Sequence, residues 1–324
     1  MLKRVLSLFP VLFYTITLPA QDAGELPVIK AVKDYDVAGP VKSLYEITYA
    51  VSFQNRTLLD STVYLDTILS RNKETNVAFD TLGRLLSDKV DSFDADGKTI
   101  LSHEVVYHYN ADKLAGILHY TNGDLLDSTY IEYNRKEEVE KLISYDHKGR
   151  LTKTIQYFYR NGNIFNIKIR NDENLLVNFI RYKYDLTGKL TEQEINGSTM
   201  QYIHSYKYKY DTLKDGTTQM NKYDYIGRYK YRSLVQHLYD TKGQLIQMIV
   251  TDSNRRVTEN HTMKYTPTGL LRSELVFTRF KNEYTYHYEY DDAGNWKTKY
   301  LSVNDKYARK THRVKELYKK QDEE

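Results

Sequence analysis

The chain contains no cysteine, and it has only five prolines and one tryptophan among 324 residues. Without cysteine it can form no disulfide and no thiolate metal site, and it cannot carry a lipid on a cysteine. Scarce proline leaves the backbone N–H groups free to pair in β-ladders. A chain of this length can still bury a core large enough to fold without covalent links.

An excess of charge of one sign is also lacking. Lysine and arginine number 47 against 43 aspartates and glutamates. Such a balance provides no extended basic surface for phosphate backbones or anionic lipid. We therefore expect no nucleic-acid partner.

Residues 1–20 have the layout of a secretory signal peptide. Lys3 and Arg4 precede an apolar run over residues 5–18, and Ala20 offers a small residue for cleavage. A membrane anchor is the alternative, but the run is shorter than the ~20 residues of a spanning helix and contains Pro10. No other segment is apolar enough for such a helix. We predict an exported protein, periplasmic or extracellular, that is not a lipoprotein.

Tyrosine is abundant, with 32 copies, and much of it belongs to a repeat. Seven times the chain has an aromatic residue, an aspartate, two variable positions and a glycine. The copies begin at Phe79, Phe93, Tyr145, Tyr184, Tyr223, Tyr239 and Tyr290. The starts at 93, 145, 184 and 223 are separated by multiples of 13 residues. A fixed period of this kind indicates a repeat protein.

Each copy has the composition of a turn between two strands. The aspartate can accept hydrogen bonds from nearby backbone N–H groups, and the glycine can adopt a positive φ. Asn-Gly pairs at 122, 161 and 196 are typical of tight two-residue hairpins. Two alternating turn classes predict an all-β protein, an antiparallel hairpin meander that reverses about every 13 residues. We expect a leader at 21–40, one β domain at 41–318 and a charged tail at 319–324.

The repeat resembles the YD repeats of the rearrangement-hotspot (RHS) family, best over residues 79–302. The motif beginning Tyr184-Asp185 carries the likeness, and Gly39-Pro40 and Trp296 resemble small exported Bacteroidetes-type members. Membership implies a long twisted sheet, curled or solenoid-like, that winds around a hollow interior. Large members enclose a toxin there, but this chain has no toxin domain and no recognisable self-cleaving region.

No catalytic or metal-binding pattern stands out from the repeat. Aligning a calcium loop on Gly97 places Ser92 at the first ligand position and His103 at the twelfth, where a bidentate glutamate is required. The nine histidines are scattered, and no serine lies in a Gly-x-Ser-x-Gly turn. We predict no cofactor, no metal and no enzymatic activity.

The sequence therefore favours a non-catalytic scaffold or binding protein of the cell envelope, with a protein or an envelope glycan as partner. Sugar rings lie flat on aromatic faces, and the densest tyrosine group is Tyr223, Tyr225, Tyr229 and Tyr231. We expect these four on two strands joined by a turn at 224–227. Two alternatives remain open: an outer-membrane β-barrel, and an enzyme whose site is assembled from repeat turns. The identity of the ligand, the oligomeric state and the closure of the sheet are not determined by the sequence.

Overall fold

The computed structural model describes residues 41–59, 62–94, 96–292 and 294–317. The predicted signal peptide, leader and charged tail lie outside these residues. The described part contains strands and turns but no helix. The strands are β1 (Val41–Leu59), β2 (Thr62–Phe79), β3 (Leu85–Phe93), β4 (Thr99–Asn110), β5 (Lys113–Thr121), β6 (Asp124–Tyr133), β7 (Val139–Asp146), β8 (Leu151–Arg160), β9 (Asn163–Asn171), β10 (Leu176–Tyr184), β11 (Leu190–Gly197), β12 (Tyr202–Thr212), β13 (Thr218–Ile226), β14 (Lys230–Tyr239), β15 (Leu245–Thr251), β16 (Val257–Tyr265), β17 (Leu271–Phe277), β18 (Lys281–Tyr290), β19 (Trp296–Val303) and β20 (Lys306–Leu317).

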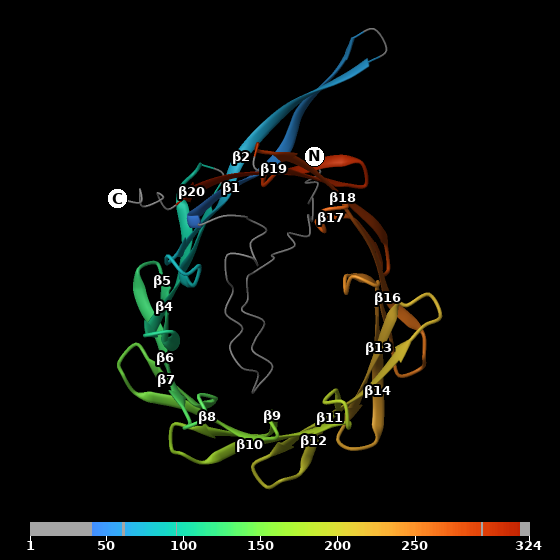
Figure 1. Cartoon of the computed structure of the whole chain (residues 1–324). Helices are drawn as coiled ribbons and strands as arrows, with labels where there is room; N and C mark the ends of the chain where they lie inside the picture. Colours follow the sequence, from blue (N-terminus) through green and yellow to red (C-terminus); the bar gives the residue numbers. More distant parts are fainter. Residues whose placement is uncertain (1–40, 60–61, 95, 293, 318–324) are drawn as a thin grey trace, which may run out of the picture.

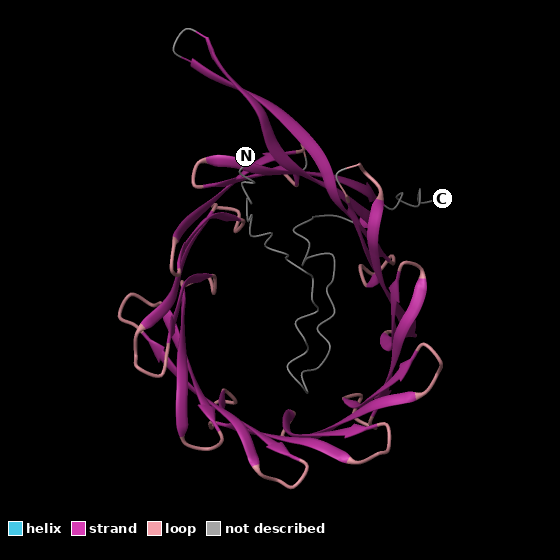
Figure 2. Cartoon of the chain, turned by 180° about the vertical axis from the view of Figure 1, so that it is seen from behind, coloured by secondary structure: helices cyan, strands magenta, loops and turns pink. Residues whose placement is uncertain are grey.

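All 20 strands belong to one antiparallel sheet, and this sheet is closed. Each strand pairs with the next in sequence, and β1 also pairs with β20 from Val41↔Leu317 to Ala50↔Arg309. Figure 1 shows the resulting ring end-on, and Figure 2 shows it from behind. The predicted all-β meander is confirmed, but the curled or solenoid-like sheet is wrong because its first and last strands hydrogen-bond to each other. The winding shell that the YD-repeat resemblance implied is overturned by the same pairing.

The aspartate–glycine turns have the predicted chemistry. In the copy that follows β10, Asp185 Oδ1 accepts hydrogen bonds from the N–H groups of Thr187 and Lys189 at 2.8 and 3.0 Å. Gly188 closes this turn with a φ of 83°. Tight Asn-Gly hairpins are also present, since Asn122 and Gly123 both have positive φ. The repeat glycines therefore occupy positions that disfavour a side chain.

Two predicted turns are wrong. Asp224 lies inside β13, opposite Ser233 of β14, and the chain reverses only after Ile226, not at 224–227. The pair at Asn196 also lies inside a strand, and the reversal follows it, with Met200 at a φ of 62°. In both places the ladder extends past the motif, because cross-strand pairing satisfies the backbone groups that the turn would otherwise bond.

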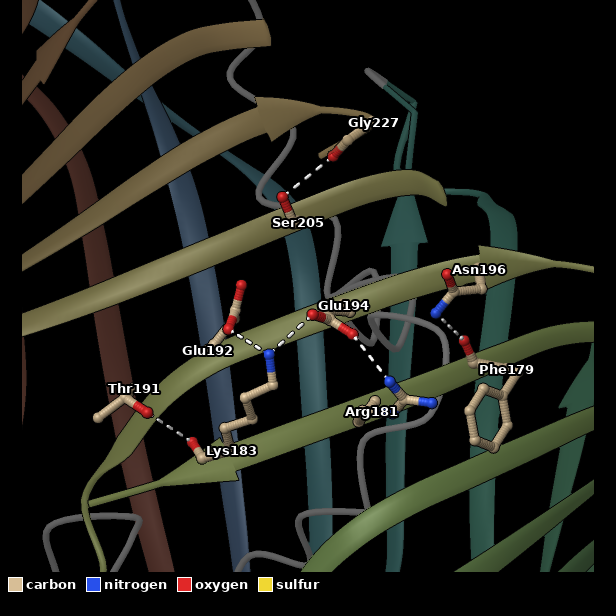
Figure 3. Close-up of polar contacts among 9 residues, drawn as sticks. All are labelled: Phe179, Arg181, Lys183, Thr191, Glu192, Glu194, Asn196, Ser205 and Gly227. Carbon is tan, nitrogen blue, oxygen red and sulfur yellow. Dashed lines mark hydrogen bonds and ion pairs between the residues drawn. The ribbon is translucent and has the colours of Figure 1, made fainter. Parts of the chain in front are cut away.

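Alternation along the strands assigns the side chains to two faces. In Figure 3 the opposite wall of the ring lies behind β10–β13, and Arg181 and Lys183 project on the near side, so they point outward. Their side chains are 49% and 47% exposed. Ile180, which precedes Arg181, has the opposite orientation and is fully buried. The concave side crowds its side chains, and we call it the inner face and the other the outer face.

The core is a layer of side chains on the inner face. Its larger cluster comes from β5–β10 and contains Leu114, Ile117, Ile131, Leu142, Ile155, Tyr157, Ile167, Ile169 and Ile180. A smaller cluster joins the start of the chain to β3 and contains Val41, Leu44, Val77, Phe79 and Leu85. Registers such as Ile155↔Ile169 and Ile167↔Ile180 stack these residues across neighbouring strands.

The first hairpin is much longer than the others. β1 has 19 residues and β2 has 18, but only the part near the ring pairs with β20 and β3. Beyond it, from Val51↔Leu69 to Leu59↔Thr62, the two strands pair with each other alone. Figures 1 and 2 show this arm projecting from the ring.

Candidate functional site

The predicted tyrosine group is only partly assembled. Tyr225 of β13 is opposite Tyr231 of β14, with ring centroids 5.9 Å apart. Tyr223 lies on the same outer face, and the Lys209 ammonium is 5.6 Å from its ring centroid. Tyr229 is separate, because it lies in the turn and is 75% exposed. These tyrosines therefore form a half-buried outer patch of three, and their role in binding stays a prediction.

Many other tyrosines serve the fold through a contact that sequence reasoning missed. A tyrosine near the end of one strand donates its hydroxyl hydrogen to a main-chain carbonyl at the start of the preceding strand. The pairs are Tyr109–Leu85, Tyr133–Leu114, Tyr159–Val139, Tyr184–Ile164, Tyr265–Leu245 and Tyr288–Leu271, at 2.7–3.0 Å. Burial raises the pKa of Tyr159 to about 12, so this hydroxyl remains a donor at neutral pH. The spacing of 17–24 residues was the signal for these contacts in the sequence.

The inner face of β12–β14 carries a polar cluster among tyrosines. His204 and Tyr206 are neighbours on this face, with ring centroids 5.1 Å apart. His204 Nε2 is 2.5 Å from Asp224 Oδ1, and the register places Tyr206 opposite Asp224. The Lys222 ammonium lies 4.2 Å from the Tyr206 ring centroid and 6.0 Å from that of Tyr208. Aromatic faces, a cation and a carboxylate thus meet on one surface.

His237 completes this cluster from β14. It stacks on Tyr239, with ring centroids 6.2 Å apart. Burial, followed by the nearby Lys222 charge, lowers the pKa of His237, so the imidazole is neutral at pH 7. Its Nδ1 is buried and has no hydrogen-bond partner among the described residues.

Two further histidine–carboxylate pairs lie elsewhere on the inner face. His119 Nδ1 of β5 is 2.6 Å from Asp127 Oδ1 of β6. His261 Nδ1 of β16 is 2.8 Å from Glu274 Oε1 of β17. The nine histidines are scattered in the sequence, but three of them are paired with acids from the next strand.

The outer face over β10–β12 is ionic (Figure 3). Glu194, with a side chain only 3% exposed, accepts a hydrogen bond from Lys183 Nζ at 2.9 Å and lies 3.6 Å from Arg181 Nη1. Lys183 also reaches Glu192 at 2.7 Å. Nearby, the Ser205 hydroxyl donates to the Gly227 carbonyl at 3.0 Å. These contacts hold neighbouring strands together.

The ends of β6–β9 form a cavity of 420 Å³ near the turns. Its lining includes Arg135, Glu138 and Tyr159. Tyr159 is occupied by its bond to Val139, and the charges around the cavity are of mixed sign. The lining of this cavity therefore does not favour one class of ligand.

Metal-binding arrangements are not found within the described ranges. No group of three or more histidine, aspartate or glutamate side chains there could hold a metal ion. Helices long and apolar enough to cross a membrane are likewise not found among those residues. The predictions of no metal, no cofactor and no enzymatic activity stay predictions.

No family model and no curated protein matches this chain. Among solved structures it is similar to a porin-like protein from Bacteroides uniformis ATCC 8492, with 9% identity over 86% of this chain and 98% of the other, at a TM-score of 0.33. It is also similar to a porin-like protein from Bacteroides vulgatus ATCC 8482, with 10% identity over 84% of this chain and 97% of the other, at a TM-score of 0.30. A chain of the Photorhabdus luminescens Tc holotoxin pore has 11% identity over 82% of this chain and 19% of its own length, at a TM-score of 0.21. These scores are too low to establish a shared fold, so the function has to be argued from the chain itself.

Proposed function

We propose that this protein is a β-barrel of the cell envelope that binds an extended saccharide on its inner face. The observation that carries the proposal is the closed ring, whose concave side bears tyrosines interspersed with histidines and carboxylates. Placement in the envelope rests on the signal peptide expected from the sequence.

The size of the ring makes its inner face a usable surface. Barrels of about eight strands are filled by their own side chains, whereas those of 16–18 strands leave room for water. A ring of 20 strands belongs to the wide class. A flexible polymer can therefore lie along the inner face without displacing the core layer.

The chemistry of the inner face suits a sugar better than an apolar ligand. Tyr206 and Tyr208 are half-buried and present ring faces, while His204 and Asp224 provide a polar pair beside them. Sugars combine flat apolar ring faces with hydroxyl groups, so they need aromatic platforms and hydrogen-bonding groups together. A fully apolar ligand would leave the polar pair without solvent or partner.

Closure favours a second candidate, the outer-membrane β-barrel. A sheet that spans lipid must leave no unpaired edge, and the ring satisfies this condition where β1 meets β20. The closed architecture that this alternative required is present, and the open scaffold is not. However, a lipid-facing outer surface would bury Arg181 and Lys183, at roughly 2–4 kcal/mol each near the bilayer midplane. For this reason we place inner-face binding in a water-exposed barrel first.

Binding is tested by calorimetry of the mature chain with soluble hexasaccharides. The inner double variant Tyr206→Ser/Tyr208→Ser should weaken binding at least tenfold. The matched outer variant, Tyr223→Ser/Tyr225→Ser on the neighbouring strand, should bind like the parent. Circular dichroism checks that both keep their strand content. Loss of binding in the outer variant alone would transfer the site to the tyrosines first expected from the sequence, and no binding by the parent would refute the proposal.

Membrane insertion is tested separately by fractionation. A water-exposed barrel should leave cells on osmotic shock without detergent. Recovery only from detergent-solubilised outer membranes would establish the second candidate instead.

A further inference from the structure

Lys222 is the unusual member of the inner-face cluster on β12–β14. It forms no ion pair within the described part of the chain. Its ammonium instead lies over the rings of Tyr206 and Tyr208. The nearest acid on its own strand, Asp224, is occupied by His204 at 2.5 Å and by Arg232 at 3.7 Å. A positive charge thus remains without a counter-ion on a concave surface.

The groups around Lys222 do not supply that counter-ion. Across β14 lies Val235, and across β12 lies Tyr208. Burial, followed by the nearby Lys222 charge, lowers the pKa of His237, so this imidazole is neutral beside the ammonium. The cluster therefore offers one cation and two aromatic rings, all on one side of three adjacent strands.

We propose that this cluster binds the carboxylate of an acidic sugar, with Lys222 as the anion partner and Tyr206 and Tyr208 as the ring platform. The inference rests on the proposed saccharide-binding function and narrows its ligand class. Ammonium–carboxylate contacts are charge-assisted and stronger than neutral hydrogen bonds. Shielding by the rings from bulk water strengthens the attraction further.

Neutral sugars would gain less from the same surface. They could stack on the tyrosines but would leave the Lys222 ammonium without an anion. Discrimination therefore should appear as a difference between two ligands of equal length, one with and one without carboxylates.

The test measures binding of the mature chain to hexagalacturonic acid and to cellohexaose by calorimetry at low salt. The acidic hexamer should bind at least tenfold more tightly, and this preference should shrink as salt is added. Lys222→Met should abolish the preference but retain cellohexaose binding. The matched control is Lys209→Met, because Lys209 also lies over a tyrosine ring, that of Tyr223, on the outer face. It should keep the full preference.

The possible outcomes separate the two proposals. Equal binding of both hexamers by the parent would overturn the acidic-sugar inference and leave the saccharide-binding function standing. No binding of either hexamer would refute both. If Lys222→Met still prefers hexagalacturonic acid to cellohexaose, the anion site lies elsewhere. If acetate competes with the acidic hexamer as effectively as galacturonate does, the cluster binds anions without recognising a sugar. Either result would overturn the inference.

Discussion

Two parts of the ring are held together by different chemistry. In the wall formed by β5–β10, aliphatic side chains such as Ile167 and Ile180 are fully buried on the inner face. In the seam formed by β19, β20 and β1, the buried centre is Arg313, which contacts Glu46 at 2.5 and 2.7 Å and lies 3.5 Å from the Trp296 ring centroid. The wall thus joins strands that are adjacent in sequence by apolar burial, whereas the seam joins the two ends of the sheet by directional contacts. Apolar burial has no preferred direction, so it tolerates small shifts of one strand along its neighbour. An ion pair forms only when the two strands are in the correct register, and closure of the ring at β1 and β20 requires that register.

The largest effect is expected in the wall. Ile180→Ala removes a fully buried side chain packed between β9 and β11, and it should lower the free energy of unfolding by about 4 kcal/mol through lost burial and a residual cavity. Urea unfolding followed by tyrosine fluorescence measures the change. As a control, exposed Val177 on the same strand should tolerate alanine with little loss. A loss below about 1 kcal/mol for Ile180→Ala would mean that the wall is not the main core.

The seam should respond more sharply to the loss of one partner than to the loss of both. Arg313→Met leaves Glu46 without its cation and should cost about 3 kcal/mol, because the pair is largely buried. Adding Glu46→Leu should recover most of this loss, since no charge is then left unpaired. The same urea titrations measure both variants. If Arg313→Met/Glu46→Leu is no more stable than Arg313→Met alone, the ion pair contributes by fixing the strand register and not by compensating a buried charge.

Tyrosine-to-carbonyl bonds occur around the ring, and three of the six, including that of Tyr159, lie in the wall. Tyr159→Phe removes a hydroxyl that donates to Val139 at 2.8 Å and should cost about 1 kcal/mol. Tyr145→Phe is the control, because the Tyr145 ring packs on Tyr130 and its hydroxyl forms no hydrogen bond within the described residues. Thermal and urea unfolding should separate the two variants. Equal stabilities would show that burial of the ring alone accounts for the tyrosine repeat.

Acid should weaken turns in both regions, for different reasons. Hydrogen bonds from Arg150 lower the pKa of Asp146 to about 2, and a hydrogen bond from Lys315 of β20 lowers that of Asp291 to about 2. Both values lie below the ordinary 3.8, so each carboxylate stabilises the fold above pH ~4, and its contribution disappears as pH falls towards ~2. In urea titrations, Asp146→Asn and Asp291→Asn should each reduce the change in the free energy of unfolding with pH between pH ~4 and pH ~2. An unchanged slope in Asp291→Asn would show that Lys315 does not tie β20 to the turn.

Local chemistry was predictable from the sequence, whereas long-range pairing was not. The turn at Asp185–Gly188 follows from residue types alone, because both the acceptor and the positive φ are local properties. The same motif at Asp224 fails, since cross-strand pairing with Ser233 outweighs it. Closure had no local signal, because Val41 and Leu317 meet from opposite ends of the chain.

The candidate site was predictable only in part. Alternation along β12 places Tyr206 and Tyr208 on one face and Lys207 and Lys209 on the other, and this follows from the sequence alone. The partners of those tyrosines come from β13 and β14, and their register depends on where the turns fall. Because β13 continues to Ile226, the position of Lys222 beside Tyr206 and Tyr208 does not follow from a turn at 224–227.

The contact between Lys42 and Glu316 joins residues 274 positions apart, whereas the tyrosine-to-carbonyl bonds of the wall span about 20. Closing the longer loop costs about 2 kcal/mol more chain entropy, and it cannot begin before the last strand is available. Hairpins of the wall can form as soon as they emerge, so assembly should proceed from the middle of the chain and end at the seam. Until β20 arrives, both edges of the growing sheet are open to other chains. The interval between synthesis and closure is thus when this sheet is most exposed to pairing with other chains.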